Sequence, residues 1–190
     1  MTATAATAAP SSVWKRLSAV DLVTVAVFAA LYRALWYVWH AISFLFPFNQ
    51  IASTMFYVLC GVAAVVIVRK LGAFTMYAIA AQLINLFLQG EMFVVASIMA
   101  AFALGGDFYI YLRLRAGADP FKSLRDMFIA GTIVGIIWSV VNWGYIFPVL
   151  FMTELSKGLY WAAGLACAAG GAIGAWFGFA LGNRLKGLIS

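Results

Sequence analysis

Long apolar runs, each bounded by polar residues, glycine or proline, follow one another along the chain. Read from one boundary to the next, they give six segments: 22–46, 51–68, 73–88, 92–112, 124 to about 147, and 159–181. The hydrocarbon core of a bilayer is about 30 Å thick, so a helix needs roughly 20 apolar residues to cross it. The pattern therefore predicts an all-α integral membrane protein, folded as a compact bundle of six transmembrane helices.

Basic residues are distributed unevenly between the two sides of this predicted bundle. With the N-terminus in the cytoplasm, ten of them fall on the cytoplasmic side: Lys15, Arg16, Arg69, Lys70, Arg113, Arg115, Lys122, Arg125, Arg184 and Lys186. Lys157 falls outside, and Arg33 lies within the first span. This asymmetry follows the positive-inside rule and predicts an N-in/C-in topology in the cell (plasma) membrane. We expect a single domain over 17–186, a disordered cytoplasmic leader at 1–16 and a cytoplasmic tail at 187–190.

Composition agrees with a membrane protein, because 66% of the residues are hydrophobic and 9% are charged. A soluble domain is about 45–50% apolar and about 25% charged. So few charges cannot coat a water-soluble particle, which excludes an ordinary cytosolic enzyme, a nucleic-acid-binding domain and a disordered chain. The formal net charge of +6 does not indicate a nucleic-acid partner, since with so few charges their placement matters more than their sum.

Two stripes of small residues indicate where helices approach closely. The last segment carries glycine and the first carries alanine at every fourth position: Gly170, Gly174, Gly178 and Gly182, and Ala26, Ala30 and Ala34. Such spacing gives a flat helix face that lets a neighbouring backbone come near. We expect the glycine stripe to pack inside the bundle. The alanine stripe fits either internal packing or a docking face for another subunit.

Polar and aromatic side chains gather in the outer half of the predicted spans, where polar residues are costly and usually mark function. The candidate substrate-binding residues are Trp36, Trp39, His40, Asn49, Gln82, Asn85, Gln89, Trp138, Asn142, Tyr145 and Trp161. Rings stack on aromatic faces, and amides or imidazole contact donor and acceptor edges. The stripes therefore predict an outward-opening pocket for a flat, largely uncharged heteroaromatic ligand. An interfacial aromatic belt is the alternative for Trp and Tyr, and a satisfied interfacial residue is the alternative for His40.

Arg33 lies near the predicted bilayer centre, eleven residues beyond Leu22 or about 16 Å of helix rise. An unpaired arginine at that depth is costly. Asp107 lies in the inner half of the fourth segment and is its natural partner by depth. We therefore expect a structural ion pair between Arg33 and Asp107 that fixes the first helix against the fourth.

The sequence holds no motif for catalysis or metal binding: no Walker A, HExxH or GxSxG, and no acidic cluster. Cys60 and Cys167 lie singly in apolar runs, as buried small hydrophobes do. We expect no enzyme activity, no catalytic residue, no metal site and no cofactor in this chain. Capture of a ligand without chemistry fits best. The alternatives are an autonomous small transporter or channel, and a membrane scaffold subunit without a ligand.

Three short motifs carry a resemblance to a known family: Arg69-Lys70-Leu71-Gly72-Ala73, Ala103-Leu104-Gly105-Gly106-Asp107, and Ala130-Gly131 followed by Asn142. With the six predicted helices and the alanine stripe, over residues 21–185, they resemble the substrate-binding S component of energy-coupling factor (ECF) vitamin transporters. The closest likeness is to the subgroup for hydroxymethylpyrimidine, the thiamine precursor. The chain departs from that subgroup at Asn85 and Asn142, where carboxylates are usual, and this weakens any preference for a cationic ligand.

The resemblance implies a membrane-embedded component that captures a small vitamin or precursor outside and delivers it inward. It also implies docking through Ala26, Ala30 and Ala34 against a transmembrane coupling subunit, which joins two cytoplasmic ATPase subunits. ATP is then used by those partners rather than bound by this chain. The loop over 148–156 fits either a lid or a plain connection.

Overall fold

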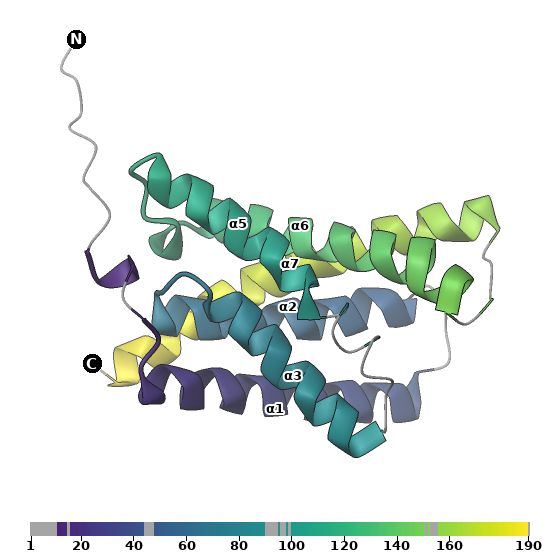
Figure 1. The fold of residues 1–190 in the computed structure, drawn as a ribbon, viewed down its shortest axis with the longest axis horizontal. Helices are drawn as coiled ribbons and strands as arrows, with labels where there is room; N and C mark the ends of the chain where they lie inside the picture. The colour runs from purple at the N-terminus through teal and green to yellow at the C-terminus, as the bar shows by residue number, and fades with distance from the viewer. Residues whose placement is uncertain are drawn as a thin grey trace, which may run out of the picture.

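Helices packed side by side form the protein, as the computed structural model in Figure 1 shows. It describes residues 11–14, 16–43, 48–89, 95, 98, 100–150, 152 and 156–189. Within these residues the regular elements are all helical. In chain order they are η1 (Ser11–Trp14), α1 (Ala19–Ile42), α2 (Phe48–Val68), α3 (Ala73–Gln89), α5 (Phe102–Arg115), η2 (Pro120–Lys122), α6 (Leu124–Val141), η3 (Asn142–Leu150) and α7 (Lys157–Ile189).

Four helical stretches are long and apolar enough to cross a membrane: Ala19–Ile42, Asn49–Val68, Leu124–Leu150 and Lys157–Leu188. Helix α3 is apolar but shorter. The predicted fourth span, 92–112, lies partly outside the described residues, and its described part contributes to the 14-residue α5. An all-helical, multi-pass membrane protein is therefore supported. Six spans and an N-in/C-in topology stay predictions.

Serine caps fix where α1 and α6 begin. At α1, Ser18 and Asp21 form a capping box: the Asp21 N–H donates to Ser18 Oγ at 3.3 Å, and the Ser18 N–H donates to Asp21 Oδ2 at 2.6 Å. At α6, the Asp126 N–H donates to Ser123 Oγ at 3.2 Å. These bonds satisfy N–H groups that the first helical turn leaves without partners, so both helices start at defined residues.

The glycine stripe of α7 packs directly on the backbone of α2. A Cβ atom added to Gly170, Gly174 or Gly178 would collide with backbone carbonyl oxygens of α2. On another face α7 is just as close to α6, because a Cβ atom at Gly131 or Gly135 would collide with backbone atoms of α7. Because glycine has no side chain, the backbones of α2, α6 and α7 approach closely and pack together. The expected internal packing of the glycine stripe is confirmed.

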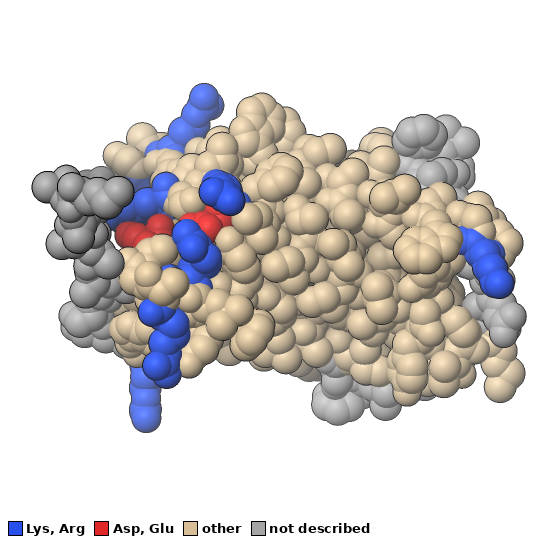
Figure 2. All heavy atoms as spheres, turned by 90° about the horizontal axis from the view of Figure 1, so that it is seen from above, with Lys and Arg blue, Asp and Glu red and all other residues tan. Residues whose placement is uncertain are grey.

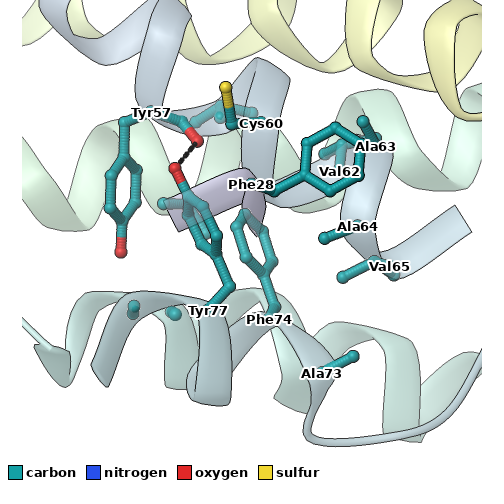
Figure 3. Packing of buried hydrophobic residues seen from close by; sticks show 14 of the residues in the cluster. Phe28, Tyr57, Cys60, Val62, Ala63, Ala64, Val65, Ala73, Phe74 and Tyr77 are labelled. Atoms are coloured by element: carbon teal, nitrogen blue, oxygen red, sulfur yellow. Dashed lines mark hydrogen bonds between the residues drawn. The ribbon is translucent and has the colours of Figure 1, made fainter. Parts of the chain in front are cut away.

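The core between α2 and α3 is built from interlocked aromatic rings (Figure 3). The Tyr77 hydroxyl of α3 donates to the Tyr57 carbonyl oxygen of α2 at 2.8 Å. The Phe74 ring lies beside both, with its centroid 6.1 Å from that of Tyr77 and 6.5 Å from that of Tyr57. This contact fixes the rotation of α3 against α2, and with it the face on which Gln82 and Asn85 lie further along α3.

Charged side chains gather at one end of the bundle, as Figure 2 shows. Three ion pairs lie there: Lys70 with Asp21 at 2.5 Å, Arg113 with Asp126 at 2.9 Å, and Lys122 with Asp119 at 3.4 Å. This end, which we call the charged end, holds the start of α1, the turn between α2 and α3, and the loop before α6. The C-terminal part of α7 lies on the same side (Figure 1).

The two ends of the chain differ from the expected leader and tail. Within the expected leader, Val13 of η1 is buried, and its carbonyl oxygen accepts a hydrogen bond from the Leu71 N–H at 3.3 Å. Helix η1 therefore packs on the bundle instead of being disordered. Residues 1–10 and 15 of the same segment lie outside the described residues. At the other terminus α7 continues to Ile189, where a tail is expected.

Candidate functional site

A cavity of about 190 Å³ lies toward the end of the bundle opposite the charged end. Its lining comes from the later halves of α1 and α3, the start of α2, the end of α6, and η3: Tyr32, Arg33, Trp36, His40, Gln50, Ser53, Asn85, Trp138, Asn142, Trp143 and Phe147. Pockets for drug-sized molecules measure about 300–1,000 Å³, so this cavity suits a smaller ligand. It offers ring faces, amides, a hydroxyl, an imidazole and a guanidinium.

Arg33 is a buried residue of the cavity lining, and 4% of it is exposed. Its Nε–H donates to the Ala81 carbonyl oxygen at 2.9 Å, and its Nη2 donates to Gln82 Oε1 at 2.8 Å. The guanidinium carbon also lies 5.0 Å from the ring centroid of Tyr32 and 5.8 Å from that of Trp36. Helix α3 therefore holds the guanidinium in a fixed plane, with neutral oxygens and ring faces around it.

Aromatic rings form two walls of the cavity. On α1, Trp36 stacks on His40 with ring centroids 3.8 Å apart and 26° between the ring planes. His40 Nδ1 lies 2.9 Å from the Trp36 carbonyl oxygen, which can only accept, so Nδ1 carries the proton. On η3, Trp143 stacks on Phe147 with centroids 4.4 Å apart and 14° between the planes. These contacts hold each ring in place before a ligand arrives.

The second wall stands on a π-helix, the nine-residue η3, which contains Pro148. Proline lacks the N–H that an α-helix needs, in keeping with a departure from α geometry here. Hydrogen bonds in a π-helix run from residue i to i+5, and such turns often occur at functional sites. This segment brings Asn142, Trp143 and Phe147 to the cavity.

Five of the predicted substrate-binding residues line the cavity: Trp36, His40, Asn85, Trp138 and Asn142. Three more stand behind its lining. Gln82 holds Arg33, while Asn49 Oδ1 accepts hydrogen bonds from Trp39 Nε1 at 2.9 Å and from Ser53 Oγ at 3.3 Å. The structure thus brings these eight residues to one site, and their part in ligand binding stays a prediction.

Two predicted residues lie away from the cavity. Tyr145 is 49% exposed and Trp161 is 68% exposed. Trp161 lines a separate apolar groove of about 260 Å³ between α6 and α7. The α-helical spacing that places Tyr145 with Asn142 fails because the wider π-turn changes the rotation of the chain after Asn142. The Gln89 side chain and, in the 148–156 loop, residues 151 and 153–155 lie outside the described residues.

The expected ion pair between Arg33 and Asp107 is not formed, and this prediction is wrong. Asp107 instead accepts hydrogen bonds at the start of α3: from the Gly72 N–H at 3.3 Å, the Thr75 N–H at 2.8 Å and the Thr75 hydroxyl at 2.6 Å. The first N–H groups of a helix need such acceptors. The carboxylate therefore caps α3 at the charged end, while Arg33 is held by the same helix at the cavity.

Five lining residues are not among the eleven candidate substrate-binding residues: Tyr32, Gln50, Ser53, Trp143 and Phe147. Ser53 follows Asn49 by four positions, so helical spacing carries a signal for it. Trp143 and Phe147 lie on the π-helix, where α-helical spacing does not apply. Arg33 precedes Trp36 by three positions and shares its face, which points to the site rather than to a remote ion pair. Tyr32 precedes Trp36 by four positions and carries the same signal.

The alanine stripe of α1 does not pack inside the described bundle. Ala26, Ala30 and Ala34 are all exposed, as are Val23 at 63% and Val27 at 60%. Of the two interpretations drawn from the sequence, internal packing is therefore excluded for the described residues. A docking face stays a prediction.

Comparison with solved structures finds a similar fold. A chain described as a "Crystal structure of an S-component of ECF transporter" matches 90% of this chain over 82% of its own length, with a TM-score of 0.66 and 20% sequence identity. The fold of this chain is similar to that of this S component. Comparison of the sequence with protein-family models and with curated proteins finds no match. The fold thus supports the S-component class, and the thiamine-precursor subgroup stays a prediction.

Proposed function

We propose that this chain is the substrate-binding component of an ECF-type vitamin importer. It captures a small heteroaromatic molecule of the thiamine-precursor kind from outside the cell membrane. It performs no chemistry on that molecule. Delivery into the cell is driven by a transmembrane coupling subunit and two ATPase subunits.

The observation that carries this proposal is the cavity between α1, α2, α3 and α6, continued by η3. Stacked ring pairs from α1 and η3 line it, and the buried Asn142 adds an amide to the same lining. Flat rings bind by stacking on such walls, and amides set their orientation. The S-component fold supports the same conclusion, since it is the fold of a transporter subunit.

The charged end supports an orientation of the protein in the membrane. Basic residues near the ends of membrane helices favour the cytoplasmic side. With the charged end in the cytoplasm, the cavity lies in the outer half of the bilayer and receives its ligand from outside. The exposed stripe of Ala26, Ala30 and Ala34 then runs along α1 as a flat face for the coupling subunit.

Ligand titration of the purified protein tests the binding function. Hydroxymethylpyrimidine, thiamine and other water-soluble vitamins are added while tryptophan fluorescence is followed. We expect saturable quenching by one compound, and about a threefold to tenfold loss of affinity in Asn142→Ala, the effect of one lost hydrogen bond. Asn183→Ala, an exposed amide on α7, is the control and leaves affinity unchanged. A flat response from folded protein across the whole panel contradicts the proposal.

Docking is tested separately by enlarging the alanine stripe. Ala30→Trp in proteoliposomes that also hold a coupling subunit and ATPases is expected to abolish ATP-dependent uptake while leaving ligand affinity unchanged, because a large side chain prevents close helix contact. Ala169→Trp, at an exposed alanine of α7, is the control. Uptake that continues without any ATPase would favour an autonomous transporter instead.

A further inference from the structure

We propose that the ligand of this cavity is a small aromatic acid, whose carboxylate or phosphate group binds Arg33 while its ring lies between the aromatic walls. The inference rests on the proposed function, because it assumes that the cavity is a ligand site. It goes further by stating the charge of the ligand, which neither the fold nor the thiamine-precursor resemblance supplies.

The first argument is the charge balance around Arg33. Both of its hydrogen-bond acceptors, the Ala81 carbonyl oxygen and Gln82 Oε1, are neutral. A buried charge is costly unless an opposite charge and hydrogen bonds compensate it, and more so within a membrane. Arg33 has the hydrogen bonds and lacks the opposite charge within the described residues. An anionic ligand supplies it.

The second argument is where the acidic residues lie. All four aspartates have partners elsewhere: Asp21 with Lys70, Asp107 with Gly72 and Thr75, Asp119 with Lys122, and Asp126 with Arg113. None of the described residues that line the cavity is acidic. The two glutamates, Glu91 and Glu154, lie outside the described residues. A cationic ligand would therefore meet Arg33 with no described carboxylate to bind it.

The third argument is the geometry of the guanidinium. Arginine has five N–H donors in a planar fork that matches a carboxylate or a phosphate. The two bonds to α3 use Nε and Nη2 and so fix the plane of the fork, while Nη1 takes part in neither. Donors held in position before binding lose little entropy when a ligand arrives. This arrangement favours a ligand oxygen that carries negative charge.

The size of the cavity limits the rest of the ligand. About 190 Å³ leaves room for a small molecule. Trp36 lies next to Arg33 on one wall, and its ring plane is held by stacking on His40. A ring beside Trp36 brings a substituent on its edge to the guanidinium. The ligand class is thus a small ring compound with one acidic group.

The test compares probes that share a ring and differ in charge. Hydroxymethylpyrimidine is compared with its monophosphate, and pyridine-3-carboxylate with its amide, by calorimetry at fixed ionic strength. We expect the acidic member of at least one pair to bind at least about tenfold more tightly than the neutral member, as a charge-assisted hydrogen bond predicts. Thiamine, a cation, is expected to bind more weakly than either acid.

Two variants separate the charge of Arg33 from its structural contacts. Arg33→Gln removes the charge, and Gln82→Glu neutralises it in place, because Gln82 Oε1 already lies 2.8 Å from Nη2. Both are expected to lower the affinity for the acid about tenfold relative to that for the neutral probe. Arg125→Gln, at an exposed basic residue of α6, is the control. Gln82→Glu keeps the test valid if Arg33→Gln fails to fold.

Each outcome has a distinct meaning. Neutral members that bind as tightly as the acids, or an acid affinity that Gln82→Glu does not change, overturn the anionic ligand and leave the binding function standing. Tightest binding by the cation also overturns the anionic ligand and leaves the binding function standing. No binding by any probe or vitamin to folded protein overturns the binding function itself, and with it this inference.

Discussion

At the charged end of the bundle, acidic and basic side chains face one another, whereas at the cavity Arg33 is surrounded by carbonyl oxygens and rings. Asp126 at the charged end accepts hydrogen bonds from Arg113 and from the Tyr109 hydroxyl, and both contacts measure 2.9 Å. Arg33 is more deeply buried than Arg113, yet has no acidic neighbour within the described residues. The paired charges at the first end are compensated within the protein, so they serve stability. In our proposal the charge of Arg33 at the cavity is compensated by a bound anionic ligand.

The largest effect should come from the charged end. Asp107→Ala removes three hydrogen bonds from a buried carboxylate, so the free energy of unfolding in mixed micelles should fall by about 3 kcal/mol. Ligand affinity measured on the remaining folded protein should change less than about twofold. Lys122→Ala, which removes an ion pair at an exposed lysine and leaves Asp119 in place, is the control and should cost about 1 kcal/mol or less. If Asp107→Ala lowered stability and ligand affinity together, the charged end and the cavity would not have separate roles.

A smaller effect is expected at the aromatic wall. Trp36→Leu removes the ring that stacks on His40 and lies beside Arg33, so ligand affinity should fall about tenfold while the protein stays folded. Trp161→Leu is the matched control, because that ring lines the groove between α6 and α7. It should leave the titration curve unchanged. An equal loss in both variants would move the binding site away from the cavity.

The smallest effect tests whether the two ends are independent. Arg33→Gln and Asp107→Asn are combined in a double-mutant cycle, with the free energy of unfolding as the readout. Sites without shared partners add to within about 0.5 kcal/mol, and among the described residues no hydrogen-bond partner is shared by these two. A coupling energy well above that value would restore the direct pairing that the sequence suggests.

Helices bounded by clear breakers were predictable from the sequence. The segments 51–68 and 73–88 correspond closely to α2 at Phe48–Val68 and α3 at Ala73–Gln89. The turn between them holds two basic residues and Gly72, whose φ of +86° is a conformation that glycine adopts without strain. The length of an apolar run and the residues that end it belong to the local sequence, so the bounds of these helices can be predicted from it. The glycine stripe is readable for the same reason.

The surroundings of Arg33 could not be read in this way. One of its acceptors is the backbone carbonyl oxygen of Ala81, a group that every residue carries and no sequence pattern marks. The rotation that presents it is set by contacts such as the Tyr77–Tyr57 hydrogen bond between α3 and α2. Depth along a helix is visible in the sequence, but rotation about its axis depends on such long-range contacts. The π-helix that turns Tyr145 away from the cavity departs from the α-helical period, so the spacing of residues in the sequence does not reveal it either.

The glycine contact between α2 and α7 also limits how the protein can change shape. Gly170, Gly174 and Gly178 each lie over a carbonyl oxygen of α2, so the contact repeats every four residues, or about 6 Å of helix rise. A slide of one residue would force Cβ atoms against those oxygens, and a slide of four would break every contact at once before new ones form. The two helices should therefore move as a single rigid body. Any motion that opens the cavity then falls to α1 and α3, which carry Arg33 and the groups that hold it.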